Sequence, residues 1–440
     1  MGLTISHPRR ELSGSKSDTE SAMPPPEPED DNAAPAEPSL VVLERIPTYL
    51  QPSLPWRRRL LHFTFAWYTI TMSTSGIALT LAVTPHRFRG LSHLGLAIFL
   101  LDLLFFLSIT LAILARFTLY RPTLRRAFTR PSESLFVPTL FLSLATILSN
   151  INEYGRLFLS AAAHARLAAG LLRVAFWIYL GATFALSVVQ YHLLFSVRKK
   201  ERRLTVGAMT PAWILPILPV MLAGTVAAAC ARGLPGRGAL PVLCAGLAAQ
   251  GLGILISVFF YATYLSRLMA FGLPVQRPGM FIAVGPPSFT CSALAAMAAE
   301  VPRVFAELGR DAEMEHGMVM GLKGEELQAL ANGVRLLAIF AAMFLWGLSF
   351  WFFASATAAV AVGMPDRKFH LSWWSFVFPN VGFTLASMRM GTALGSEGLL
   401  WFSTVMTVLL FLGWVFVAFR CIRAVYKREI VWPGHDEDEG

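Results

Sequence analysis

Polar side chains recur at helical spacing inside segments that are otherwise apolar. Four of them, in the stretch 135–154, share the spacing i, i+4, i+7, i+11 and therefore one face of a helix. They are Thr139, Ser143, Thr146 and Asn150. Hydroxyl and amide groups can both donate and accept hydrogen bonds. A stripe of this kind predicts a polar lining for a path through apolar helices.

Three further segments contribute polar residues of the same type. They hold Thr71, Ser73, Thr74 and Ser75, then Ser288, Thr290 and Ser292, then Asn380, Thr384 and Ser387 at i, i+4, i+7. A small hydroxyl residue can instead serve close helix packing or bond to its own backbone. For any one serine or threonine that structural explanation is the simpler one. Two aligned stripes on separate segments favour a polar lining.

The segments that hold these residues are distinguished by proline. Five of ten long apolar stretches carry proline inside them or just past one end, and they alternate with five that are almost free of it. The first set has Pro85, Pro138, Pro211, Pro216, Pro219, Pro286, Pro287 and Pro379, and the second has Pro241 at a terminus. Proline frees backbone groups, which at membrane depth must face protein or water. We therefore expect an inner ring of helices, with kinks at Pro286, Pro287 and Pro379, inside an outer ring of straight helices.

The composition is typical of a membrane protein. Hydrophobic residues make up 55% of the chain and charged residues 15%, whereas roughly a quarter of residues are charged in soluble domains. A hydrocarbon core about 30 Å thick requires about 20 apolar residues of helix. The expected spans are 61–84, 92–116, 135–154, 167–195, 209–231, 240–265, 279–300, 333–361, 373–392 and 399–425. The predicted fold is an all-α membrane protein with ten transmembrane helices.

The ends of the chain differ from this apolar part. The sequence indicates a disordered cytoplasmic tail at 1–54, a ten-helix domain at 55–428 and an acidic cytoplasmic tail at 429–440. Basic residues gather in the loops of one face, for example at 57–59 and 198–203, so the positive-inside rule places both termini in the cytoplasm. Because these residues are spread over short loops, we expect the lipid bilayer of the plasma membrane, and no nucleic acid, as their partner.

No motif typical of an enzyme is present. The sequence lacks the phosphate loop G-x-x-x-x-G-K-[ST], the dinucleotide motif G-x-G-x-x-G and the zinc motif H-E-x-x-H. Its four cysteines show neither metal-ligand spacing nor a disulfide framework, although a Cys230–Cys244 bond is conceivable. We therefore expect no catalytic residues, no cofactor and no metal. Any movement of solute across the membrane must then be driven by a concentration or electrical gradient.

Three blocks of sequence resemble one known family. They are His62-Phe63-Thr64-Phe65-Ala66-Trp67-Tyr68 with Thr71-Met72-Ser73-Thr74, then Gly285-Pro286-Pro287-Ser288-Phe289-Thr290, then W-W-S-F-V-F-P-N-V-G-F-T from Trp373. With them, region 55–428 resembles the fungal malic acid transporters of the tellurite-resistance/dicarboxylate transporter family, which also includes the slow anion channel of plant guard cells and fungal sulfite efflux pumps. The resemblance implies five hairpins around a quasi-fivefold central pore, with odd-numbered helices inside and, in several members, a homotrimer.

The same resemblance implies transport of small organic anions, above all C4-dicarboxylates such as malate, with a co-transported proton as a further candidate partner. Efflux of sulfite or another small inorganic anion is the alternative on the same fold. Three residues depart from the fungal pattern: Ser75 and Ser288 stand where glycine is expected, and Val381 replaces a threonine. Each belongs to an expected inner helix and could retune the pore, which weakens the assignment of malate itself.

Relatives of the anion-channel type close the pore with a phenylalanine on the ninth helix, and the motif aligns that residue with Phe378, directly before Pro379. On a regular helix Phe378 would lie about 200° from Asn380, whereas Phe376 would lie only about 40° from it. Because Pro379 interrupts the helix at this point, Phe378 is the first candidate for the gate and Phe376 the second. Ordinary aromatic packing is the alternative for both.

Two charged residues fall inside expected spans. Arg389 follows Phe378 at i+11, so it points the same way about 16 Å further along the helix, where it could attract an anion or extend to lipid headgroups. Asp102 is the carboxylate deepest in an apolar segment. Pairing with a neighbouring helix is the favoured explanation for it, and proton coupling is the alternative.

Overall fold

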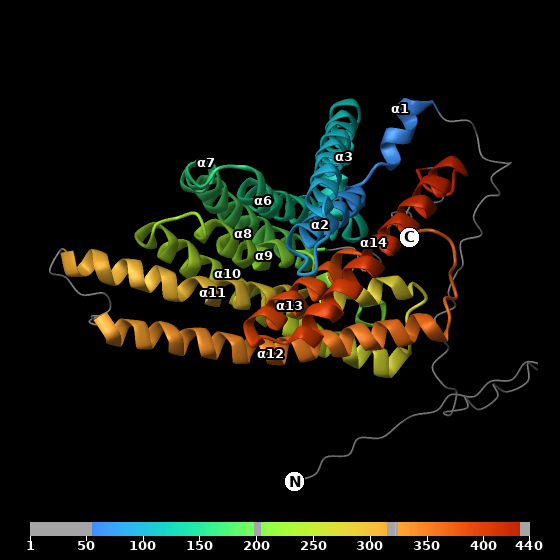
Figure 1. Ribbon diagram of the computed structural model, residues 1–440. Coiled ribbons are helices and arrows are strands. Elements are labelled where there is room, and N and C mark those ends of the chain that lie inside the picture. The colour runs from blue at the N-terminus through green and yellow to red at the C-terminus, as the bar shows by residue number, and fades with distance from the viewer. Residues whose placement is uncertain (1–54, 198–203, 315–321, 323, 432–440) are drawn as a thin grey trace, which may run out of the picture. The chain divides into compact units, whose positions relative to one another are not determined.

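The computed structural model describes residues 55–197, 204–314, 322 and 324–431, and these fold into helices (Figure 1). The predicted tail 1–54, the basic cluster 198–203 and most of the predicted tail 429–440 lie outside the described residues. The longer helices are α2 (Tyr68–Val83), α3 (Leu91–Leu119), α6 (Pro138–Phe158), α8 (Arg173–Phe195), α9 (Leu218–Ala231), α10 (Gly236–Phe271), α11 (Gly285–Met314), α12 (Gly324–Val362), α13 (Phe378–Leu394) and α14 (Glu397–Tyr426). The predicted all-α class is confirmed.

Shorter helical segments connect and extend these helices. The α-helical ones are α1 (Trp56–Arg59), α4 (Pro122–Thr129), α5 (Pro131–Ser134) and α7 (Ala161–Leu167), and Ala168–Leu172 (η4) is a π-helix that continues into α8. The 3-10 segments are η2 (Leu60–His62), η3 (Phe65–Trp67), η6 (Val206–Ala208), η7 (Pro211–Ile214), η8 (Arg277–Val284) and η9 (Leu371–Phe376). Four of them, η3, η7, η8 and η9, precede the helices α2, α9, α11 and α13.

Seven helical stretches in the described part of the chain are long and apolar enough to cross a membrane. They are Leu91–Leu119, Pro131–Phe158, Ala161–Phe195, Gly236–Phe271, Arg277–Asp311, Gly324–Val362 and Glu397–Tyr426. The expected spans 61–84, 209–231 and 373–392 instead contain the short helices α2, α9 and α13, of 16, 14 and 17 residues. A 3-10 segment precedes each of the three helices and takes up residues that a continuous α-helix would have used.

Proline marks these changes of helix type. Pro138, Pro219 and Pro379 stand in the first turns of α6, α9 and α13, and Pro286 and Pro287 open α11 directly after its glycine. The first turn of a helix has no acceptor for its N–H groups, so a residue without an N–H is tolerated there. At Pro286, Pro287 and Pro379 the chain passes from a 3-10 segment into an α-helix.

Burial separates the helices into two groups. Nearly every residue of α2, α9 and α13 is buried, as are 94% of the apolar window in Arg277–Asp311 and 67% of that in Pro131–Phe158. In the other five long stretches the buried share is only 22% to 39%. Their open faces carry large apolar side chains such as Leu104, Ile178, Phe259, Phe344 and Ile422. Apolar faces of this extent suit a lipid environment.

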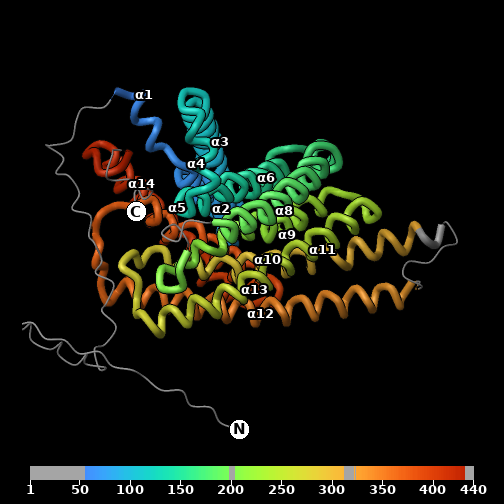
Figure 2. The backbone as a smooth tube through the Cα atoms, turned by 180° about the vertical axis from the view of Figure 1, so that it is seen from behind, coloured from blue at the N-terminus to red at the C-terminus, as the bar shows by residue number. Residues whose placement is uncertain are grey.

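The buried helices form a closed cycle of contacts: α2 packs against α6, α6 against α9, α9 against α11, α11 against α13, and α13 against α2. The more exposed helices lie against them, with α3 on α2, α10 on α9, α12 on α11 and α14 on α13. Figures 1 and 2 show α11 and α12 running side by side along their length. The alternation along the sequence thus corresponds to an alternation between buried and exposed helices.

Glycine brings two of the buried helices unusually close together. A Cβ atom at Gly382 of α13 would lie 2.7 Å from Ser288 Oγ and 2.8 Å from Phe289 Cε2, both on α11. Real Cβ atoms do not approach other atoms so closely, so only glycine fits between α11 and α13 at this level.

Candidate functional site

The polar stripe of α6 faces α2. Ser143 Oγ lies 2.6 Å from Thr71 Oγ1, and Thr139 Oγ1 donates to the Phe65 carbonyl at 2.9 Å. Thr146 donates to carbonyls of its own helix. These side chains therefore bond α6 to α2, to the 3-10 segment η3 that precedes α2, and to the backbone of α6 itself. This is the structural explanation open for any hydroxyl residue. Their contact with a transported solute stays a prediction.

Asn150, at the end of this stripe, bonds to the middle of α2. Its Nδ2 donates to the backbone carbonyl of Ser75 at 2.8 Å and to Ser75 Oγ at 2.9 Å. Both residues are fully buried. Ser75, one of the departures from the fungal pattern, thereby gains a specific partner that a glycine side chain could not supply.

The polar residues of α11 and α13 likewise satisfy backbone groups. Ser288 Oγ donates to Val284 and Gly285 carbonyls, Thr290 Oγ1 donates to the Pro286 carbonyl, Asn380 Nδ2 to that of Phe376 and Thr384 Oγ1 to that of Asn380. Two of these acceptors, on Pro286 and Phe376, lie in the stretches where proline interrupts backbone bonding. The hydroxyl and amide groups compensate in part for that interruption.

The two candidate gate residues occupy different segments. Phe376 ends η9, where its ring lies 5.4 Å from that of Phe281, whereas Phe378 is the first residue of α13 and lies 5.1 Å from the ring of Phe289. Phe378 is buried and Phe376 partly buried. Because Phe376 belongs to the 3-10 segment, its angle to Asn380 on a regular α-helix does not describe this chain. The geometric argument for Phe376 over Phe378 therefore loses its basis.

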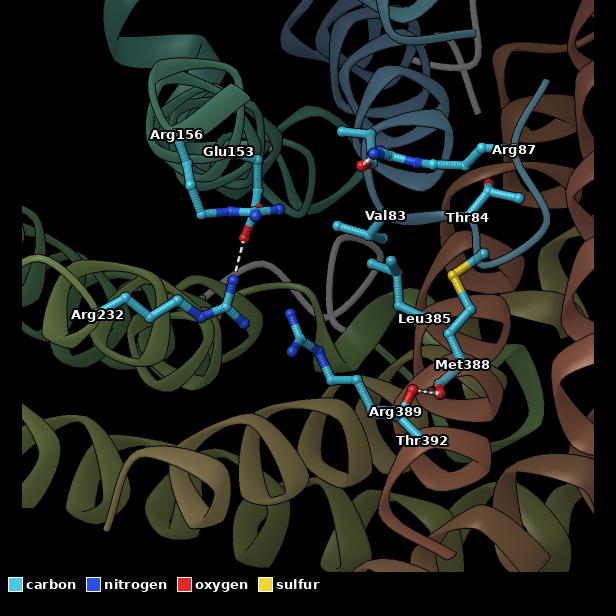
Figure 3. A pocket seen from close by; sticks show the side chains of 11 residues that line it. Val83, Thr84, Arg87, Glu153, Arg156, Arg232, Leu385, Met388, Arg389 and Thr392 are labelled. Carbon is cyan, nitrogen blue, oxygen red and sulfur yellow. Dashed lines mark hydrogen bonds and ion pairs between the residues drawn. The ribbon is translucent and has the colours of Figure 1, made fainter. Parts of the chain in front are cut away.

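A cavity of about 360 Å³ lies at the C-terminal ends of several buried helices (Figure 3). Four segments line it. They contribute Ala82 and Val83 at the end of α2 with Thr84 and Arg87 just after it; Glu153 and Arg156 of α6; Arg232 just after α9; and Leu385, Met388, Arg389 and Thr392 of α13. Four arginines and one carboxylate share this wall. Charge and concavity together make it a candidate anion-binding site.

The carboxylate of the cavity is already neutralised. Glu153 is buried and accepts from Arg232 Nη1 at 2.5 Å and from Arg156 Nη2 at 3.1 Å. Arg232 also approaches Glu300 Oε1 of α11, at 3.5 Å from its Nε. These pairs link α6, α11 and the end of α9, and they leave Glu153 little capacity to neutralise a further cation.

Arg389 and Arg87 are the two cavity arginines without an ion pair; Arg87 donates to the Ala82 carbonyl, whereas Arg389 forms no hydrogen bond with the described residues. The Nε of Arg389 is buried and has no hydrogen-bond partner in the described residues, and Glu153 and Glu300 act on it only at longer range. Figure 3 shows its guanidinium directed into the space between Arg232 and Leu385. An arginine with open donors in a concave, positively charged site is suited to binding a carboxylate in two-pronged fashion.

Of the four arginines of the cavity, the sequence singled out only Arg389. Arg87, Arg156 and Arg232 come from three separate segments, and only the fold brings them to one wall. The i, i+3 spacing of Glu153 and Arg156 is a signal for their pairing. The partnership of Glu153 with Arg232, 79 residues away, has no such signal.

No group of three or more metal-ligating side chains occurs in the ranges that the structure describes. Cys230 and Cys244 are both free thiols, the first buried and the second exposed. The conceivable disulfide between them is therefore not formed in this structure.

Comparison with known proteins places the chain among anion-transporting membrane proteins. Residues 62–422 match the SLAC1 family model, described as "Voltage-dependent anion channel". The chain is 32% identical to the "Putative malic acid transport protein" of Schizosaccharomyces pombe, over 88% of this chain and 85% of that protein. It is 29% identical to the "Malic acid transport protein" of the same organism, over 88% and 84%. A "Sulfite efflux pump SSU1" of Trichophyton rubrum is more distant, at 24% identity over 80% and 88%.

Proposed function

Because the chain belongs to the SLAC1 family of anion-transporting membrane proteins, which are not enzymes, we propose that it carries C4-dicarboxylates such as malate. The path runs along the cycle of buried helices α2, α6, α9, α11 and α13. The observation that carries this proposal is the unpaired guanidinium of Arg389 in a cavity whose carboxylate is already neutralised.

The size and charge of the cavity suit a small dicarboxylate. Its volume of about 360 Å³ corresponds to roughly twelve water molecules at about 30 Å³ each, which admits such an acid with part of its hydration shell. Arg389 binds one carboxylate, and the positive potential of the neighbouring arginines attracts the second. The paired arginines keep that attraction moderate, so the anion can also leave.

For the architecture, we propose ten transmembrane helices in five hairpins around a quasi-fivefold pore. The cycle of buried helices supports this arrangement, as do the 3-10 segments that lengthen α2, α9 and α13. With the basic loops in the cytoplasm, both termini are cytoplasmic and the Arg389 cavity opens outward from a plasma membrane. The family resemblance adds a homotrimer.

Phe378 is the proposed gate of this pore. It begins α13 and contacts Phe289 of the adjacent buried helix α11. Thr71, Ser75, Ser143, Thr146, Asn150, Ser288, Thr290, Asn380 and Thr384 are the proposed polar lining. Rotation of the Phe378 ring away from Phe289 would open the path without moving a helix.

A second candidate, efflux of sulfite or another small inorganic anion, draws support from the similarity to the sulfite efflux pump. Arg389 could attract either kind of anion. A divalent organic acid benefits more from several arginines spread over one wall, and this favours the dicarboxylate.

Uptake by proteoliposomes tests the proposal. Purified protein is reconstituted, and entry of labelled malate, succinate and sulfite is compared with that in protein-free vesicles, with and without a pH gradient. We expect malate and succinate to enter faster than sulfite. Sulfite flux without malate flux would replace the proposed substrate by the second candidate.

A matched pair of variants ties the flux to the cavity. Arg389→Ala removes the unpaired cation, whereas Arg335→Ala removes an exposed arginine of α12. Only the first should reduce malate uptake. Equal loss in both would detach the flux from the Arg389 cavity.

A further inference from the structure

The turn between α9 and α10 carries Arg232 to the wall of the cavity. It is short, because α9 ends at Ala231 and α10 begins at Gly236. Nη1 of Arg232 donates to Glu153 at 2.5 Å, whereas its Nη2 forms no hydrogen bond with the described residues. Since a guanidinium has five N–H donors, Arg232 keeps donors for a ligand while Glu153 holds one edge of it.

Arg232 and Arg389 line the same cavity from separate parts of the chain. Figure 3 shows their two guanidinium groups turned toward the same space, with Arg232 beneath Glu153. A dicarboxylate offers one carboxylate to each arginine, whereas a monocarboxylate can satisfy only one of them. The second arginine is therefore the point at which the site can tell these two kinds of anion apart.

The turn that carries Arg232 is fastened to α11. Arg303 of α11 donates from Nη2 to the Ala231 carbonyl at 2.7 Å and from Nη1 to the Leu234 carbonyl at 3.1 Å. Glu307, one helical turn further, accepts from the backbone N–H of Gly236 at 2.7 Å. Each of these bonds involves a charged group, and such bonds are stronger than those between neutral groups. Side chains of α11 thus hold the turn at its start, in its middle and at its end.

Two carboxylates of α11 fix Arg303 itself. Its Nη1 donates to Glu307 Oε1 at 2.9 Å and its Nε to Glu300 Oε2 at 3.2 Å. Glu300 Oε1 in turn lies 3.5 Å from Nε of Arg232. Arg303 is not among the residues that line the cavity, so its contacts reach the cavity through Arg232.

Backbone packing agrees with this clamp. A Cβ atom at Gly236 would lie 3.0 Å from Glu307 Cβ and 3.0 Å from the Val304 carbonyl oxygen, so the end of the turn lies directly against α11. Ala231 and Leu234, whose carbonyls Arg303 binds, are both buried. The turn therefore has little freedom to carry Arg232 elsewhere while the clamp holds.

We propose that Arg303 is a positioning residue, which holds the α9–α10 turn so that Arg232 receives one carboxylate of a dicarboxylate while Arg389 receives the other. This inference rests on the proposed function and names the part of the molecule that makes the site prefer dicarboxylates. A monocarboxylate gains nothing from the placement of Arg232, because Arg389 alone satisfies it. The preference for dicarboxylates thus depends on a side chain of α11 outside the cavity.

Transport kinetics of two anions test this role. Reconstituted protein takes up labelled malate or labelled lactate over a range of concentrations. Arg303→Gln should raise the KM for malate about ten-fold, the effect of one charged hydrogen bond, with little change in the maximal rate or in the KM for lactate. Arg310→Gln is the matched control and should change neither KM, because this arginine of α11 bonds to the Ala306 carbonyl of its own helix. An unchanged KM for malate in Arg303→Gln, or equal shifts in the two variants, overturns the proposal.

Two further variants separate position from charge. Arg303→Lys keeps the positive charge but lacks the fork that reaches two carbonyls at once, so it should show part of the rise in KM. In protein that already carries Arg232→Ala, Arg303→Gln should add nothing to the KM for malate, because it acts through Arg232. Wild-type kinetics in Arg303→Lys, or an undiminished effect in the Arg232→Ala background, overturns the proposal.

Hydrogen–deuterium exchange tests the clamp without any substrate. Arg303→Gln should speed exchange of the amides in 231–236, whereas Arg310→Gln should not, and unchanged exchange in Arg303→Gln overturns the inference. If Arg303→Gln does not fold, Glu307→Ala takes its place, since it frees the Gly236 N–H and should speed the same exchange.

The two measurements also separate this inference from the proposed function. Malate uptake by the wild type with an unchanged KM in Arg303→Gln overturns the inference and leaves the proposed function standing. Absence of malate uptake in the wild type refutes the proposed function, and the exchange data then decide on the clamp alone.

Discussion

The anion-binding role proposed for Arg389 follows from the bonds that the other arginines of the cavity form. The cavity holds four arginines, but Glu153 engages Arg156 and Arg232, and Arg87 donates to the Ala82 carbonyl. Among these four arginines, Arg389 is the one that forms no hydrogen bond with the described residues. A lone guanidinium in a partly buried site binds a carboxylate strongly because the competing water is limited.

Arg389→Ala should weaken the binding of divalent anions most. Loss of a charged hydrogen bond costs about 2 kcal/mol, which corresponds to a roughly thirty-fold higher KM for malate. Arg389→Lys should recover part of this loss, because it restores the charge without the fork of donors. Uptake kinetics for malate and a monocarboxylate measure the difference, and an equal effect on both anions would speak against the role.

Phe378→Ala should raise anion flux or leak several-fold, because it removes the ring that contacts Phe289 in the proposed path. Phe376→Ala is the matched control, since that ring packs on Phe281 in a different segment. Vesicle uptake measures the flux, and size-exclusion profiles show whether each variant is folded. If Phe376→Ala raises flux and Phe378→Ala does not, the gate is Phe376.

At the scale of helices, the polar residues of the buried segments use their donors to join helices and to bond to backbone carbonyls. Ser143, Thr139 and Asn150 hold α6 against α2, and Ser288 and Thr290 bond to carbonyls of their own helix. Proline and 3-10 segments leave backbone groups open, and these side chains meet part of that demand. These bonds accord with the structural explanation, and the role of the same residues as a polar lining stays a prediction.

The contact between α13 and α11 depends on Gly382. Gly382→Ala should lower stability by about 1–3 kcal/mol, since the added methyl would overlap Ser288 Oγ and Phe289 and push the helices apart. Gly347→Ala on α12 is the matched control, because no atom lies within 4 Å of its added methyl and alanine favours a helix. Thermal unfolding in detergent compares the two. Equal melting temperatures would show that α13 and α11 separate freely.

At the scale of the whole molecule, the described helices divide into a buried cycle and an exposed set. Large apolar side chains cover the exposed set, and the charged cavity lies at one end of the cycle. This division is what transport requires, since lipid needs an apolar outer surface while an anion needs polar and positive groups inside.

The proposed orientation predicts that both termini face the cytoplasm. Epitope tags at the two ends should resist protease added to intact cells and be cut once the membrane is permeabilised. The physical reason is the concentration of arginine and lysine in the loops of one face, which are retained on the cytoplasmic side. Cleavage of either tag in intact cells would refute the even number of spans or the orientation.

The sequence by itself determined the all-α class, the membrane environment and the alternation between two sets of segments. These follow from local properties: hydropathy over about 20 residues and the effect of proline on backbone bonding. The lengths of the α-helices could not be predicted as well from the sequence. Because 3-10 segments take up residues before α2, α9 and α13, a length criterion finds seven spans in the described residues where hydropathy predicted ten.

Tertiary structure alone decided which charges act together. Glu153 and Arg232 are 79 residues apart, and their pairing is what leaves Arg389 open. It also set the buried Asp102 of α3 beside Ser75 of the neighbouring helix α2. The physical reason is that electrostatic partners are chosen by distance in space, and no periodicity along one chain encodes the distance between separate helices.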